Sequence, residues 1–231
     1  MIYYNQEHIG GIKMKKLVAW AIVLIMVCFT MCGCGGQSSI SKMRRHNSKK
    51  DIIKFDDIEW LSERKDVENK IKEILNDSEL KIENEELDRK EGLKNSGLTE
   101  YVTEISNDSD IIGEIAGWNI KKLLIYYISN DNGQSQYAYN FIVYFNSGNT
   151  NSGIVFNDIK DKLNAKYKDG SNSNWTAEWN DSNNNSTYMT IIPGNGGTVY
   201  LTYSCGDVEA YIDDIEEKYD NGKKQQDSKG L

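Results

Sequence analysis

Histidine and cysteine, which carry much of the nucleophilic and metal-dependent chemistry of proteins, are scarce in this chain. Beyond residues 1–33 the sequence has a single histidine, His46, which stands in a basic segment rich in glycine and serine. A Ser-His-Asp triad, a Cys-His pair or a multi-histidine metal site therefore has no base or ligand set in the part that should fold. We predict a protein that is not an enzyme and that uses no metal or cofactor.

Cys205 is the only thiol after Cys34, and it stands between an expected strand end and an expected helix N-terminus. A helix dipole at such a position can activate a thiol. Without a histidine partner, we favour a small buried hydrophobic residue over a nucleophile. Pairing with another molecule, as an odd cysteine of an exported protein can do, stays an alternative.

Carboxylates are abundant, so counting them does not exclude a glycosidase pair. Four lie near expected strands or loops: Glu114, Glu178, Asp181 and Glu209. No local pattern selects two of them as acid and base. The runs 108–110 and 180–183 offer oxygen ligands, but neither reproduces the 12-residue calcium loop, and we favour turn chemistry for both. A carboxylate-dependent hydrolase is the third of our functional hypotheses.

Aromatic side chains are the best sequence clue to a binding surface. Trp175 and Trp179 are four residues apart in an expected strand and so share one of its sides, while Tyr188 and Tyr200 belong to neighbouring strands. Together these four rings form the candidate binding face, which can stack on sugars or dock a protein. The alternative is that the rings fill the core.

The N-terminal segment has the layout of a secretory signal. Lys15 and Lys16 precede an apolar run of 15 residues, 17–31, which is too short for a typical membrane span. We predict a signal peptide over residues 1–33, with translation starting at Met14. A cleaved signal with incidental cysteines is the alternative to the lipid attachment considered next.

The motif Met31-Cys32-Gly33-Cys34 resembles the lipobox of bacterial lipoproteins. The resemblance implies cleavage before Cys34, diacylglycerol on its sulfur and further acylation, for example by palmitate, at the new N-terminus. Cys32 is a weaker candidate because the bulky Met31 precedes it. The expected location is the extracytoplasmic face of the cell membrane, where the lipid is the anchor.

Charge divides the rest of the chain into a tether and a domain. Residues 34–50 carry five Lys/Arg and no acid, whereas residues 51–231 carry 19 Lys/Arg and 34 Asp/Glu. We predict a flexible basic tether over 34–50, which can also lie on anionic head groups. An acidic domain follows over 51–220, with a disordered tail over 221–231. Its charge argues against binding nucleic acid.

Apolar spacing predicts an α+β domain in which helices and antiparallel strands alternate. We expect N-terminal helices over 62–75 and 79–95, and a stretch over 98–105 that fits either period. Strand-forming runs follow over 111–120, 121–129 and 137–146, the last two as a hairpin. A helix carrying Ile159, Leu163 and Tyr167 interrupts the sheet. A meander over 175–180, 187–192 and 198–203 then leads to an amphipathic C-terminal helix over 207–219, so we expect a sheet of about five strands.

The segment 55–60, FDDIEW, leads into Ser62 and Asp66-Val67, and residues 155–159, VFNDI, form a degenerate second copy. This pattern resembles the start of the helix-plus-sheet units in β-lactamase-inhibitor-protein-like and outer-membrane-assembly-lipoprotein-like domains. The family usually has Trp-Gly where Leu61 follows Trp60 here, and the second copy lacks the Trp. Over residues 55–204 the resemblance implies a concave sheet that binds a protein without catalysis.

We therefore predict a non-catalytic, membrane-anchored lipoprotein that binds an envelope protein. A lipoprotein that binds cell-wall glycan is the alternative.

Overall fold

The computed structural model describes residues 40, 53–75, 79–88, 90–130, 132–167, 171–172, 176–180, 187–193 and 198–229. The chain divides into the units Met1–Ser39 and Ile40–Leu231, and the described residues all belong to the second. The predicted signal helix, signal peptide and Cys34 lie outside them. Within the predicted tether, Ile40 is described and is buried in the core, where the sequence predicted a free spacer. No helix in the described part of the chain is long and apolar enough to cross a membrane.

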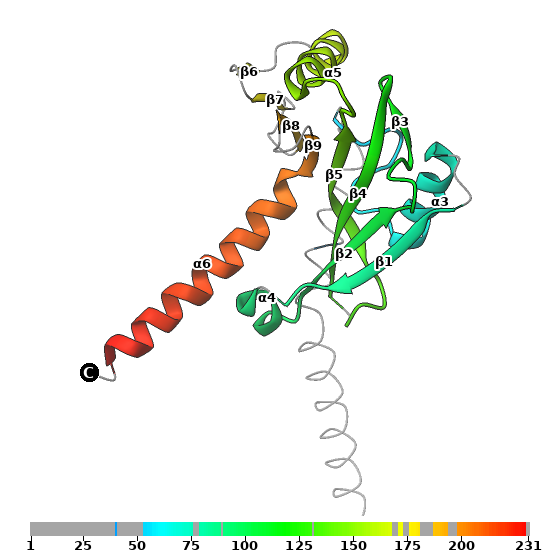
Figure 1. Ribbon diagram of the computed structural model, residues 1–231. Helices are drawn as coiled ribbons and strands as arrows, with labels where there is room; N and C mark the ends of the chain where they lie inside the picture. Colours follow the sequence, from blue (N-terminus) through cyan, green and yellow to red (C-terminus); the bar gives the residue numbers. More distant parts are fainter. Residues whose placement is uncertain are drawn as a thin grey trace, which may run out of the picture. The chain divides into compact units, whose positions relative to one another are not determined.

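The described residues form an α+β fold with two successive groups of elements, as predicted (Figure 1). The first group consists of α3 (Arg64–Leu75), β1 (Lys81–Glu86), α4 (Glu91–Asn95), β2 (Thr99–Ser106), β3 (Gly113–Ile115), β4 (Trp118–Ser129) and β5 (Tyr137–Asn146). The second consists of α5 (Ser152–Tyr167), β6 (Ser171–Asn172), β7 (Ala177–Asn180), β8 (Thr187–Pro193), β9 (Thr198–Cys205) and α6 (Gly206–Lys229). Each group thus places a helix before a set of strands.

The strands make one antiparallel sheet in the order β1-β2-β4-β5-β9-β8-β7-β6, with β3 paired to β4 outside this path. Each group supplies four strands of the path, and β5 joins the two by pairing with β9. The β4–β5 pairing confirms the predicted hairpin, and the β7–β8–β9 pairing confirms the predicted meander. The sheet has nine strands, more than the five or so expected, because β1, β2 and the short β6 also take part.

Several predicted boundaries are wrong. The strand expected over 111–120 is divided between β3 and the first residues of β4. The helix expected over 79–95 is a strand over Lys81–Glu86 followed by the short helix α4, because pairing with β2 places Ile82 opposite Ile105 and outweighs the helix propensity of Glu and Lys. The helix expected over 207–219 continues as α6 to Lys229, through most of the tail predicted to be disordered. An ion pair of 3.7 Å between Lys223 Nζ and Glu91 Oε2 supports part of this extension.

One face of the sheet is the core. Phe141, Val143 and Phe145 of β5 point to it and are fully buried, together with apolar side chains of α3 and α5. Phe55 stacks on Phe141 with 5.2 Å between the ring centroids, and Trp60 lies 5.7 Å from the same ring. The segment ahead of α3 therefore packs into the middle of the core, and the rigid sheet that results fixes the opposite face.

Candidate functional site

The second face of the sheet is built from the side chains that alternate with the core residues. Because strand side chains point to opposite faces with period two, each strand contributes every second residue. We call this surface the open face and define it by Val102, Glu104, Lys122, Leu124, Tyr126, Ile142, Tyr144, Thr190, Ile192, Tyr200 and Thr202. Most of these side chains are half-buried, and Ile192 is exposed.

A row of ordered side chains crosses the open face from strand to strand. Tyr144 and Tyr200 are directly paired, and their rings meet edge to face at 4.9 Å. Lys122 Nζ lies 4.9 Å from the Tyr144 ring centroid and 3.1 Å from Glu104 Oε2. Burial raises the pKa of Tyr144, so its hydroxyl stays protonated and neutral. The row offers aromatic and charged groups in fixed positions.

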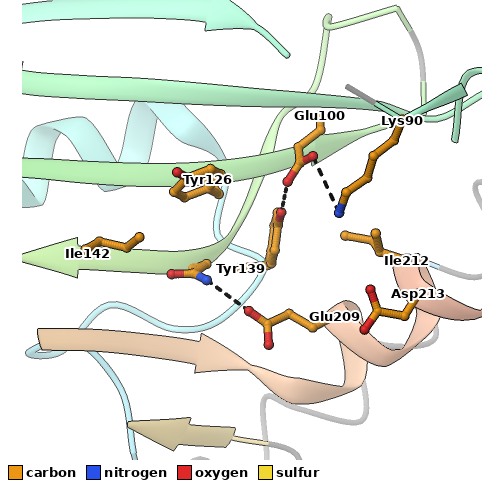
Figure 2. Close-up of a pocket in the computed structure, with 9 residues that line it drawn as sticks. Lys90, Glu100, Tyr126, Tyr139, Ile142, Glu209, Ile212 and Asp213 are labelled. Carbon is orange, nitrogen blue, oxygen red and sulfur yellow. Dashed lines mark hydrogen bonds and ion pairs between the residues drawn. The ribbon is translucent and has the colours of Figure 1, made fainter. Parts of the chain in front are cut away.

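A cavity of about 310 Å³ lies where α6 meets this face, and we call it the α6 cavity (Figure 2). Its lining consists of Lys90, Glu100, Tyr126, Tyr139, Asn140, Ile142, Glu209, Ile212 and Asp213. The Tyr139 hydroxyl donates a hydrogen bond to Glu100, and Lys90 Nζ lies 3.8 Å from the same carboxylate. Burial and then the Glu100 charge raise the pKa of Tyr139, so Tyr139 remains a donor. Three carboxylates thus share the lining with one lysine.

Two further hollows continue along the open face. One, of about 470 Å³, lies against β1 and shares Tyr126 with the α6 cavity. The other, of about 380 Å³, reaches Thr198 and shares Glu104 with the first. The three linings together contain seven carboxylates and three lysines, which makes the open face acidic. Such a field attracts a positively charged ligand or partner.

Contacts between α4 and α6 hold the outer wall of the α6 cavity. Glu216 of α6 accepts a hydrogen bond of 2.9 Å from the backbone N–H of Leu93. Glu216 therefore caps the N-terminus of α4, since the N-cap residue Lys90 makes no side-chain cap. The Tyr219 hydroxyl donates to Glu91 at 2.9 Å. A Cβ added to Gly92 would lie 3.0 Å from Glu216 and from Tyr219, so glycine permits this close approach.

The aromatic candidate face is corrected in one respect. Trp179 is 1% exposed and its indole N–H donates to Asn164 Oδ1 at 3.0 Å, because its register opposite Met189 places it on the core face. It therefore cannot stack on a sugar or a partner, as an exposed platform would require. Tyr200 does lie on the open face. The Trp175 residue and the Tyr188 side chain lie outside the described residues.

Of the carboxylates and the cysteine considered in the sequence, only some lie at the open face. Glu209 lines the α6 cavity, while Glu114 and Glu178 are exposed on β3 and β7 and Asp181 lies outside the described residues. Cys205 is fully buried at the end of β9, which confirms its prediction as a small core residue.

Of the nine residues that line the α6 cavity, the sequence analysis named only Glu209 as a candidate, and the eight that it missed include Lys90, Glu100, Tyr139 and Asp213. One signal was present, because Asp213 follows Glu209 by one helical turn. The others depended on pairings between distant strands.

No protein-family model, curated protein or solved structure matches this chain. The resemblance carried by residues 55–60 stays a prediction, and function is argued from the open face.

Proposed function

We propose that this chain is a lipid-anchored extracytoplasmic protein whose folded part binds another protein of the cell envelope through the open face, without catalysis. The observation that carries the proposal is the contrast between the two sides of the sheet. One side is a fully buried core, and the other presents ordered, half-exposed tyrosines and charges along contiguous hollows. Tyrosine is enriched at the centres of protein interfaces.

The strand scaffold supports this proposal because it fixes the contact groups before a partner arrives. Tyr144 already contacts both Tyr200 and Lys122, so little side-chain entropy is lost when a partner covers these residues. A surface of this kind suits recognition of a folded or extended protein segment.

The proposed location rests on the sequence. The motif that ends at Cys34 supplies an anchor, and the basic residues of 34–50 suit the space beside anionic head groups. The acidic domain would then be held at the membrane surface through this anchor, where its open face can meet a partner.

Site-specific photo-crosslinking of the full chain in cells tests the proposed binding. A photoreactive amino acid replaces Thr202 on the open face or, as the matched control, the exposed Ile154 of α5. We expect one envelope protein to be trapped from position 202, with no such adduct from position 154. Equal adducts from both positions, or none from position 202, would overturn the proposal. An adduct that muramidase degrades would instead establish the glycan-binding alternative.

Metabolic labelling with an alkyne fatty acid tests the anchor. Cys34→Ser should abolish labelling and release the protein from the membrane fraction, whereas Cys32→Ser should leave both unchanged. Labelling that persists in Cys34→Ser and disappears in Cys32→Ser would show that Cys32 carries the lipid. If the unsubstituted chain is not labelled, the proposed lipid anchor is wrong.

A further inference from the structure

We propose that the α6 cavity receives the guanidinium group of an arginine side chain from the protein bound at the open face. This inference rests on the proposed function and specifies the chemistry of the partner. Three properties of the cavity carry it: its charge, one unsatisfied hydrogen-bond acceptor and its apolar lining.

The charge of the cavity is unbalanced. Lys90 pairs with Glu100, and Tyr139 donates to the same carboxylate, so the resident cation and phenol are engaged there. Asp213 makes no hydrogen bond or ion pair with any residue that the structure describes. It lies one helical turn from Glu209, so both carboxylates project from the same side of α6 toward the sheet (Figure 2). An incoming cation would compensate this remaining negative charge.

An unsatisfied acceptor in the cavity favours a ligand that donates hydrogen bonds. The Asn140 amide nitrogen donates a hydrogen bond to Glu209 at 2.9 Å, which fixes the orientation of the amide. Its oxygen is then the group that can accept a hydrogen bond from a ligand. That oxygen is buried and accepts no hydrogen bond from the described residues. An unsatisfied buried polar group costs about 1–3 kcal/mol, so a donor that reaches Asn140 is favoured.

The floor and the size of the cavity suit an arginine side chain. Tyr126, Ile142 and Ile212 offer apolar contact for its methylene stem, and Tyr126 supplies an aromatic ring in the lining. Guanidinium presents five donors in a rigid plane and stacks on aromatic rings, which a lysine ammonium does not match. A volume of about 310 Å³ is at the small end of ligand pockets, as a single side chain requires.

The test titrates the purified full-length lipoprotein in detergent with the peptide acetyl-Ala-Arg-Ala-amide and measures binding by calorimetry. The matched peptides carry citrulline, which has the same shape without the charge, or lysine. The matched protein variants are Asp213→Asn and Asp214→Asn, since Asp214 pairs with Lys218 at 2.6 Å and does not line the cavity. We expect Asp213→Asn to weaken arginine-peptide binding about tenfold or more, as loss of a close charge pair does, and Asp214→Asn to leave it unchanged.

Several results would overturn the inference: equal binding of the arginine and citrulline peptides, binding of the lysine peptide as tight as that of arginine, or equal effects of the two variants. Crosslinking from position 202 separates this failure from that of the proposed function. If Asp213→Asn leaves the adduct at full yield and the arginine peptide does not bind, the inference fails while protein binding at the open face stands. If no adduct forms in the unsubstituted chain, the proposed function itself fails. Unchanged thermal unfolding of both variants confirms that they are folded.

Discussion

The two faces of the same sheet use the same strands for opposite purposes. On β5, Phe141, Val143 and Phe145 are fully buried against the helices, while Ile142 and Tyr144 between them are half-buried among charged neighbours. The core face is almost wholly apolar, whereas the hollows of the open face are lined by seven carboxylates and three lysines. Neighbouring residues of one strand should therefore differ sharply in what their substitution changes: stability on one side, binding on the other.

Phe141→Ala tests this contrast with the largest expected effect. Its ring contacts Phe55 and Trp60 at the centre of the core, so truncation should cost about 3–5 kcal/mol of unfolding free energy. Tyr144→Ala, on the other face of the same strand, should cost under about 1.5 kcal/mol and reduce adduct formation from position 202. Denaturant unfolding of the full chain measures both losses. Comparable losses would mean that the open face is a second core.

Trp179→Phe examines a residue whose face was wrongly predicted. The smaller ring leaves a cavity and removes the indole hydrogen bond to Asn164, so we expect a loss of about 2 kcal/mol. In the folded, unsubstituted protein, iodide should quench little of the Trp179 fluorescence. If the variant is as stable as the unsubstituted protein but binds the partner more weakly, Trp179 belongs to the binding face after all.

Spacing along the chain predicted the elements that carry their own signal. The stripe of Val67 and Ile71 gave α3, and the breakers between apolar runs gave the hairpin and the meander. The strand over Lys81–Glu86 was missed because its residues favour a helix locally, and only its pairing with β2 makes it a strand.

The candidate site was harder to predict than the fold because its residues come together through distant pairings. Asn140 of β5 contacts Glu209, which lies 69 residues further along the chain, and Glu100 contacts Tyr139 across a separation of 39 residues. The same pairings decide which side of the sheet each residue faces, so Trp179 was misplaced even though the alternation of its strand was right.

Gly92→Ala tests the contact that holds the outer wall of the α6 cavity. The added Cβ would lie 3.0 Å from Glu216 and Tyr219, so α4 and α6 must move apart by a few tenths of an ångström, and we expect this strain to exceed the helix preference of alanine by about 1 kcal/mol. Gly222→Ala is the matched control, because no atom lies within 4 Å of its added Cβ and alanine favours the helix by about 1 kcal/mol. Thermal unfolding should therefore shift in opposite directions. Stabilisation by both would show that α4 does not pack closely on α6.

Asp158→Asn has the smallest expected effect and concerns the helix that covers the core face. Asp158 Oδ2 accepts hydrogen bonds from Lys162 Nζ at 2.7 Å and from Trp118 Nε1 at 2.6 Å, which ties α5 to the start of β4. The hydrogen bond from Lys162 and then that from Trp118 lower the pKa of Asp158. A carboxylate whose pKa falls on folding stabilises the protein fully above its unfolded pKa of about 3.9 and loses this contribution as the pH drops further.

Substitution by Asn should therefore reduce stability at neutral pH, by under about 1 kcal/mol because solvent screens an exposed pair. The difference from the unsubstituted chain should shrink as the pH falls below about 4. Unfolding curves recorded between pH 7 and pH 3 measure this trend. A difference that grew on acidification would mean that the charge of Asp158 opposes folding. Packing alone would then hold α5 on the core face, and the hydrogen bonds of Asp158 would contribute nothing to the stability of that face.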